Sequence, residues 1–161
     1  MRKFISWGPA LFVAIIGIAA SQDAQPPGHV MTTPSEIKWG DPPKVFEKGA
    51  TFAVVSGDPS KTGIYVVRLK MPAGYKIAPH WHPTDEHVTV ISGQFALGMG
   101  DKIDEATAKA LPLGAYALLP AKMHHYAVAK SEAVVQVHGM GPFALTYVNS
   151  ADDPSKRLSS E

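Results

Sequence analysis

The sequence contains no cysteine among its 161 residues. This absence excludes disulfide bonds, thiolate nucleophiles, and zinc or iron–sulfur sites that depend on cysteine ligands. Histidine and carboxylate side chains remain as strong metal ligands, and the chain has seven histidines and 14 acidic residues. Any metal ion that this protein binds must therefore be held by nitrogen and oxygen atoms.

The sequence also lacks an excess of charge of either sign, because 15 basic residues face 14 acidic ones. Residues 1–20 hold two of the basic residues and none of the acidic ones, so the rest of the chain has a formal net charge of −1. A protein that binds phosphate backbones needs a dense basic face, whereas the lysines here are scattered. We expect no nucleic-acid partner.

The apolar stretch near the N-terminus, Leu11–Ala20, is too short to cross a bilayer, which takes about 18–20 residues. Arg2 and Lys3 precede it and small residues end it, as in a secretory signal peptide. We predict that residues 1–20 are a signal peptide, that the protein is exported to the periplasm or secreted, and that it has no membrane partner after cleavage. An uncleaved membrane anchor is the alternative.

The length and the hydrophobic content of 45% fit one folded domain. We interpret the proline-rich residues 21–50 as a tether that leads at most to an edge strand, residues 51–150 as the domain, and residues 151–161 as a polar tail. Short runs of β-branched and aromatic residues, each bounded by turn residues, predict eight strands. They span residues 52–56, 64–71, 86–91, 94–99, 115–119, 125–129, 133–138 and 144–148. This pattern is typical of an all-β sandwich or barrel. Residues 103–111 are rich in helix formers and favour one helical turn, with a polar loop as the alternative.

His80 and His82 are two residues apart, so in an extended segment their side chains leave the same face, with α-carbons about 6.5–7 Å apart. Glu86 has the same parity and follows Pro83-Thr84-Asp85, where a bend can bring its carboxylate to the same centre. A single histidine is more often a core or surface residue satisfied by hydrogen bonds. Three suitable residues together favour a metal site.

At these residues the sequence resembles the cupin superfamily, whose two motifs are matched in order and spacing. The matching residues are Gly74, His80, His82, Glu86 and Gly93, followed by Gly114, Pro120 and His125. The resemblance spans about residues 52–148 and implies a single-domain RmlC-like jelly roll, the double-stranded β-helix barrel. It also implies that His80, His82, Glu86 and His125 hold one metal ion.

Two residues depart from the family pattern. Lys122 stands where the family usually has glycine, and Ala129 where it often has asparagine, which affects a turn and one hydrogen bond but no ligand. Family spacing selects His125 as the ligand, so His124 is expected to point outward. His87 has the opposite parity from Glu86 and is expected outside or at the rim.

Three imidazoles and one carboxylate leave one or two positions free on a six-coordinate ion. This set suits a divalent transition metal, namely Mn, Fe, Ni, Co, Cu or Zn, and does not choose among them. The ion would therefore be open to a small-molecule substrate.

The strand at residues 133–138 carries a polar pair, because Gln136 and His138 share one face with Val134. If that face lines the barrel, His138 is a candidate general acid or base and Gln136 a hydrogen-bond donor to the substrate. The alternative is a core histidine paired with a backbone group. Tyr65 and Tyr116 either reach the pocket or belong to the core.

Our leading hypothesis is a metal-dependent enzyme acting on a small oxygen-rich molecule that chelates the ion, with a quercetinase-type dioxygenase as the subclass that the resemblance implies. The alternatives are a non-catalytic exported module that holds metal or senses a small ligand, and a metal-free cupin that binds sugar. We also expect a homodimer, because residues 94–99 place Phe95, Leu97 and Met99 on one strand face that needs a partner.

Overall fold

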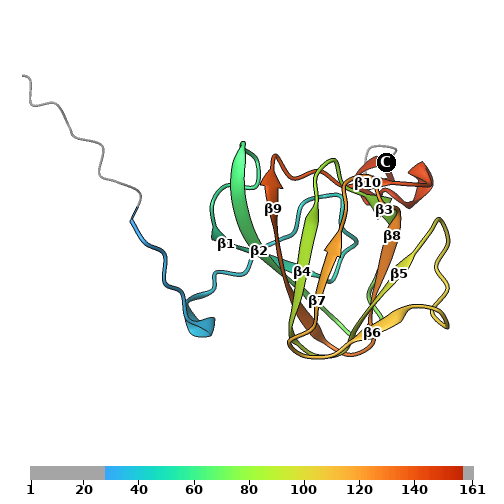
Figure 1. Ribbon diagram of the computed structural model, residues 1–161, viewed down its shortest axis with the longest axis horizontal. Helices are drawn as coiled ribbons and strands as arrows, with labels where there is room; N and C mark the ends of the chain where they lie inside the picture. The colour runs from blue at the N-terminus through green and yellow to red at the C-terminus, as the bar shows by residue number, and fades with distance from the viewer. Residues whose placement is uncertain (1–27, 158–161) are drawn as a thin grey trace, which may run out of the picture.

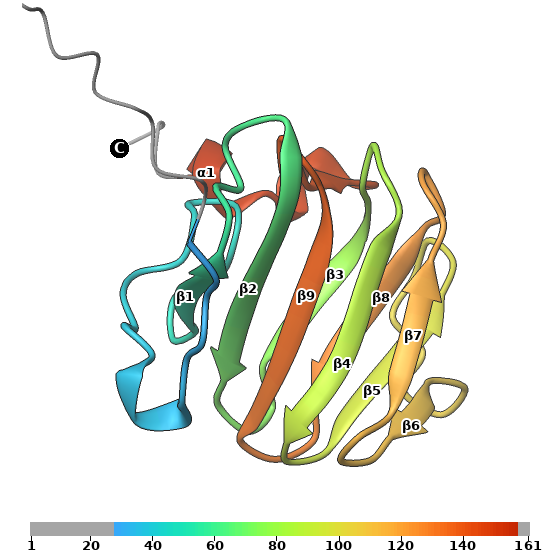
Figure 2. The ribbon, with the colours of Figure 1, turned by 60° about the vertical axis from the view of Figure 1, so that its left-hand side comes forward.

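The computed structural model describes residues 28–157, which form two antiparallel five-stranded sheets in two layers (Figures 1 and 2). The predicted signal peptide at residues 1–20 lies outside these residues, as do residues 158–161 of the predicted tail. Within residues 28–157, no helix is long and apolar enough to span a membrane.

The sheets confirm the all-β prediction. The first has the order β1-β2-β9-β4-β7, formed by β1 (Thr51–Ser56), β2 (Gly63–Met71), β9 (Ala133–Gly141), β4 (Glu86–Ser92) and β7 (Tyr116–Leu119). The second has the order β10-β3-β8-β5-β6, formed by β10 (Thr146–Tyr147), β3 (Lys76–Trp81), β8 (His125–Ala129), β5 (Phe95–Met99) and β6 (Lys109–Leu111). The helical elements are the 3-10 turns η1 (Pro34–Glu36) and η2 (Ser150–Asp152) and the short α1 (Pro154–Arg157).

Each of the eight expected strands is present, most with shifted ends, and the structure has two further strands, β3 and β6, that the sequence did not predict. β3 contains Pro79 and has a register shift between Ile77 and His80, so it does not show a clean alternating pattern. β6 is three residues long and lies within the stretch rich in helix formers.

Alternate side chains of the strands fill the space between the sheets. On β2, Val67 and Leu69 point inward, while Val66 and Arg68 are partly exposed on the outer face. On β5, Phe95 and Leu97 are buried in the core, so the expectation that they form an outward apolar face is wrong. The homodimer therefore loses that argument and stays a prediction.

The segment before β6 lies over the outer face of the second sheet and does not form a helix. The Tyr126 hydroxyl of β8 donates a 2.6 Å hydrogen bond to the Asp104 carbonyl, and Glu105 pairs with Lys76 at 2.6 Å and with Lys130. Residues 104–108 form one hydrogen-bonded turn. Contacts with residues distant in the sequence thus override the local helix preference.

The later part of residues 21–50 is more than a tether. Val45 and Phe46 are partly buried against the core and Ala50 is fully buried. The hydroxyls of Tyr75 and Tyr147 donate 2.7 Å hydrogen bonds to backbone carbonyls of this segment. The segment is therefore part of the barrel wall.

Gly98 on β5 leaves room for the ring of Tyr126, its partner on β8. A β-carbon at position 98 would lie 2.0 Å from that ring, and Tyr126 is only 1% exposed. We predict that Gly98→Ala lowers the free energy of unfolding by about 1–3 kcal/mol, because the buried ring must move. Urea denaturation measures this loss.

Gly40→Ala is the matched control, because no atom of the described residues, apart from its own chain neighbours, lies within 4 Å of the added β-carbon. The control should change stability by less than about 0.5 kcal/mol. Equal stabilities of the two variants would contradict the packing described for Tyr126.

Candidate metal centre

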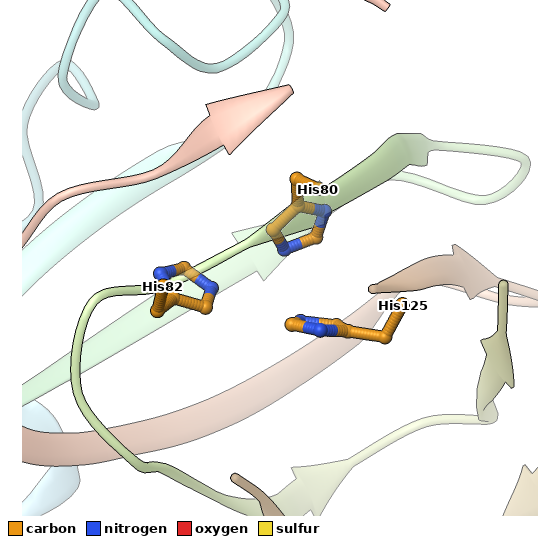
Figure 3. A group of neighbouring side chains, drawn as sticks. All are labelled: His80, His82 and His125. Carbon is orange, nitrogen blue, oxygen red and sulfur yellow. The ribbon is translucent and has the colours of Figure 1, made fainter. Parts of the chain in front are cut away.

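Three histidine side chains point toward one another inside the protein (Figure 3). His80 is on β3, His82 lies just after that strand, and His125 opens β8 and pairs with His80 across the sheet. All three are buried, and one ring nitrogen of each lies within 4.8 Å of the others. The structure thus brings together the three histidines that the sequence predicts.

Backbone carbonyls fix the orientation of each imidazole. The pairs are His80 with Ala78, His125 with Met123 and His82 with Ala144, with Nδ1 to oxygen distances of 2.7, 2.9 and 2.7 Å. A carbonyl oxygen only accepts, so each Nδ1 carries the proton and donates it. In the neutral form of each ring, Nε2 then has a free lone pair.

Those lone pairs are suited to a metal ion. The Nε2 atoms of His82 and His125 are buried and have no hydrogen-bond partner among the described residues. Burial, and then the neighbouring His125 and His82, lower the pKa of His80 to about 3, so this imidazole is neutral at neutral pH. Neutral imidazoles with free Nε2 atoms fit a divalent transition-metal ion, for which His80, His82 and His125 would be ligands.

Glu86, the first residue of β4, brings a carboxylate to the histidines. Its Oε1 lies 3.5 Å from Nε2 of His82, and its Oε2 lies 3.3 Å from Nε2 of His125. Burial raises the pKa of this carboxyl, whereas protonated forms of His125, His82 and His80 lower it, and the balance lies below its usual range. Glu86 is therefore an anion beside the centre, placed to complete the ligand set or to accept a proton.

Two hydrogen bonds donated by backbone amides join the loops that carry the two motifs. The amide of Lys122 donates to the His82 carbonyl at 2.8 Å, and the amide of Ala121 donates to Oδ1 of Asp85 at 2.8 Å. Lys122 has a φ of 63°, and Met123 closes the turn by donating to the Pro120 carbonyl at 3.0 Å. The turn thus keeps the left-handed geometry that glycine normally supplies.

The rest of the cavity is lined by apolar side chains. Its volume is about 40 Å³, and apart from His80, His82, Glu86 and His125 its lining contains only aliphatic and aromatic residues. Phe46 and Phe143, both half-buried, stack with ring centroids 6.2 Å apart, and Phe143 lies 5.6 Å from the His82 ring. The sequence does not mark these two aromatic residues as part of the cavity, because both lie in irregular segments outside the two motifs.

The structure places Gln136 and His138 on the outer face of the first sheet, so the prediction that their strand face lines the barrel is wrong. Val135 and Val137 line the cavity in their place. Gln136 accepts a 3.1 Å hydrogen bond from Arg68, and His138 stacks on His87 with centroids 4.6 Å apart. The uniformly apolar face of β9 is buried, as the hydrophobic effect requires.

The other two histidines discussed above lie outside the centre. His124 points away from it and pairs with Asp101 at 2.6 Å, and Nδ1 of His87 lies 2.6 Å from the Tyr116 hydroxyl. The outward positions expected for His124 and His87 match the structure. Of the two tyrosines, Tyr65 is buried inside and Tyr116 is exposed.

Comparison with known proteins identifies the same architecture. The family model described as the ChrR cupin-like domain matches residues 27–144. The polyketide cyclase RemF from Streptomyces resistomycificus is similar in structure, with a TM-score of 0.65 and 14% identity over 82% of this chain and 94% of that one.

A candidate acetylacetone dioxygenase from Methylibium petroleiphilum has a TM-score of 0.60 and 17% identity, over 79% of this chain and 85% of that one. An RmlC-like cupin from Shewanella frigidimarina has a TM-score of 0.54 and 15% identity, over 70% and 91%. At these identities the likeness concerns the fold. A search of curated proteins finds no match.

We predict one transition-metal ion per chain and a loss of affinity of at least about 100-fold in His82→Ala, because one of three converging ring nitrogens is removed. Metal analysis after dialysis and competition with a chelator measure both quantities. His124→Ala is the control, since that ring binds Asp101, and should bind metal like the wild type. Equal losses in the two variants would place the centre elsewhere.

We also predict that Lys122→Gly raises the free energy of unfolding by about 1 kcal/mol, because a left-handed φ is costly for a side chain and free for glycine. Lys122 is exposed, so little packing is lost. Ala121→Gly in the same turn lacks the positive φ and should lower stability instead. Thermal unfolding of both variants checks the pair, and a destabilised Lys122→Gly protein would contradict the strain.

Proposed function

This chain belongs to the family of ChrR cupin-like domains, and from that premise we propose that it is a metal-dependent enzyme of the dioxygenase type. Its substrate is a small molecule that binds the ion through two neighbouring oxygens. The observation that carries the proposal is the pair of buried Nε2 atoms, on His82 and His125, that have no partner among residues 28–157. Such atoms are rare in folded proteins unless a ligand satisfies them.

A bound ion would polarise the oxygens of the substrate and, if redox-active, help to engage dioxygen, the second reactant. The residues of the chain hold and position the reactants. The three imidazoles donate their Nδ1 protons to backbone carbonyls, so these protons are not exchanged with the substrate. Glu86 is the anionic side chain at the centre, and its carboxylate accepts the proton that an enol or a catechol releases on binding.

The cavity lining supports a substrate with an apolar body. Among residues 28–157, no polar side chain other than the three histidines and Glu86 lines the cavity, so a sugar or a charged molecule would lose its hydration without compensation. A volume of about 40 Å³ admits only a small head group, and the body of the substrate rests against Phe46 and Phe143. The similar acetylacetone dioxygenase candidate is described as acting on a small diketone, which has these properties.

A second candidate function is a non-catalytic module that holds metal or senses a small ligand. The outward position of Gln136 and His138 favours it, because it removes the two additional polar groups that we expected to assist catalysis. Export from the cytoplasm and homodimer formation, proposed from the sequence, are compatible with both candidates.

We predict that the metal-loaded protein consumes dioxygen in the presence of a small diketone, catechol or enediol, as measured with an oxygen electrode. Glu86→Gln should lower the rate by about 100-fold or more, because the amide cannot accept the proton of the substrate. Metal analysis of the same sample shows whether this variant still holds the ion.

The outcome separates the two candidate functions. A protein that binds metal and the small chelators but consumes no dioxygen and forms no product is a binding module. His124→Ala serves again as the control, and it should retain the wild-type rate because His124 is outside the centre.

A further inference from the structure

Two histidines outside the candidate centre lie side by side on the outer face of the first sheet. His87 on β4 and His138 on β9 are directly opposite each other in the pairing of these neighbouring strands (Figure 2). Their rings are parallel within 7°, with centroids 4.6 Å apart. Glu86, the residue before His87, points to the candidate centre on the inner face. The sheet therefore separates this histidine pair from the centre.

The ring nitrogens of the pair are available to a ligand. Nδ1 of His87 lies 2.6 Å from the Tyr116 hydroxyl, whose oxygen can accept a hydrogen bond from it. In that neutral tautomer Nε2 of His87 has a free lone pair, and the hydroxyl orients the ring as the second partner of a metal-bound imidazole does. Among residues 28–157, none forms a hydrogen bond with the ring of His138.

The spacing of the two rings suits a shared ion. Bonds from a metal ion such as Zn²⁺ to an imidazole nitrogen are about 2 Å long, so two nitrogens up to about 4 Å apart can bind one ion. Rings with centroids 4.6 Å apart reach that range by turning about their Cβ–Cγ bonds. Both side chains are only partly buried, so these turns are not blocked by a packed core.

Met140 adds a sulfur atom on the same face. It lies two residues after His138 on β9, so its side chain leaves the strand on the same side. Met140 is 47% exposed, and together with His87 and His138 it lines a shallow hollow of about 450 Å³. The flexible side chain of methionine can carry its thioether toward the two rings.

This mixture of ligand atoms indicates which ion fits. Imidazole suits zinc, copper, iron and nickel, whereas a neutral thioether selects soft Cu⁺. Zinc takes thiolate, imidazole and carboxylate ligands in proteins. Asp85 also lines the hollow, but one of its carboxylate oxygens already accepts a hydrogen bond from the amide of Ala121. Copper is therefore the metal that the imidazoles and the thioether have in common.

We propose that His87, His138 and Met140 bind a Cu⁺ ion at a second metal site, on the outer face of the first sheet. The site does not depend on the proposed function of the buried centre. It is open to solvent and takes three ligands from the chain, so it exchanges its ion readily. The ion retained after dialysis is that of the buried centre.

The test uses the purified protein, loaded with Zn²⁺ and dialysed, and then titrated with Cu⁺ without oxygen. Bicinchoninate, a chelator that forms a coloured Cu⁺ complex, competes for the added ion. We expect one Cu⁺ per chain with the Zn²⁺ content unchanged. His138→Gln should raise the dissociation constant for Cu⁺ at least about 10-fold and keep its Zn²⁺, because it removes one ligand of the outer site alone. His124→Gln is the matched control and should bind Cu⁺ like the wild type.

Met140→Leu tests the sulfur ligand, since leucine keeps the size and the apolar character of the side chain. We expect its dissociation constant for Cu⁺ to rise about 10-fold and that for Cu²⁺ to stay unchanged, because only the softer ion needs the thioether. Met31→Leu is the control, because Met31 is 81% exposed and lies outside the hollow. Thermal unfolding of the metal-free variants should match the wild type, as all these positions are at the surface.

Three outcomes overturn the proposal. Wild-type affinity for Cu⁺ in His138→Gln rules out the histidine pair as the site. Release of Zn²⁺ in proportion to the Cu⁺ bound places the copper in the buried centre instead. Equal affinities for Cu⁺ in Met140→Leu and Met31→Leu refute the thioether ligand and, with it, the assignment to Cu⁺.

Discussion

The hydrogen bond from each histidine Nδ1 to a backbone carbonyl is the interaction on which the candidate centre depends. It fixes the tautomer and the direction of every ring, and so decides where the Nε2 lone pairs point. Two of the carbonyls, those of Ala78 and Met123, are two residues before their histidines. The third, from Ala144, is 62 residues from His82. The ring of His82 is therefore held only when the chain around β10 is in place.

The sequence predicts the cluster of three histidines well, because short-range patterns determine it. Two histidines at a spacing of two on an extended strand must share a face, and the second motif adds His125. It predicts β9 less well, because alternation divides a strand into two faces without saying which is inside. The apolar face with Val135 and Val137 was the physical choice for the interior, and the polar side chains of Gln136 and His138 drew the functional interpretation to the wrong face.

Contacts between distant segments account for the rest of what the sequence does not predict. Carbonyl oxygens such as that of Ala144 are present at every residue, so no pattern marks the one that orients His82. Phe46 and Phe143 come together only because a loop before β1 and a loop after β9 meet at the same end of the barrel. The left-handed Lys122 shows the opposite case, in which the fold keeps a turn although the residue is unfavourable for it.

The long separation between His82 and Ala144 also bears on how the protein acquires its ion. Contacts between residues far apart in the chain form late in folding, because closing long loops costs entropy. A complete set of oriented imidazoles is then absent from early folding intermediates, and metal capture follows barrel closure. The metal found in a purified sample thus records which ions surrounded the chain when it finished folding, as much as the preference of the site itself.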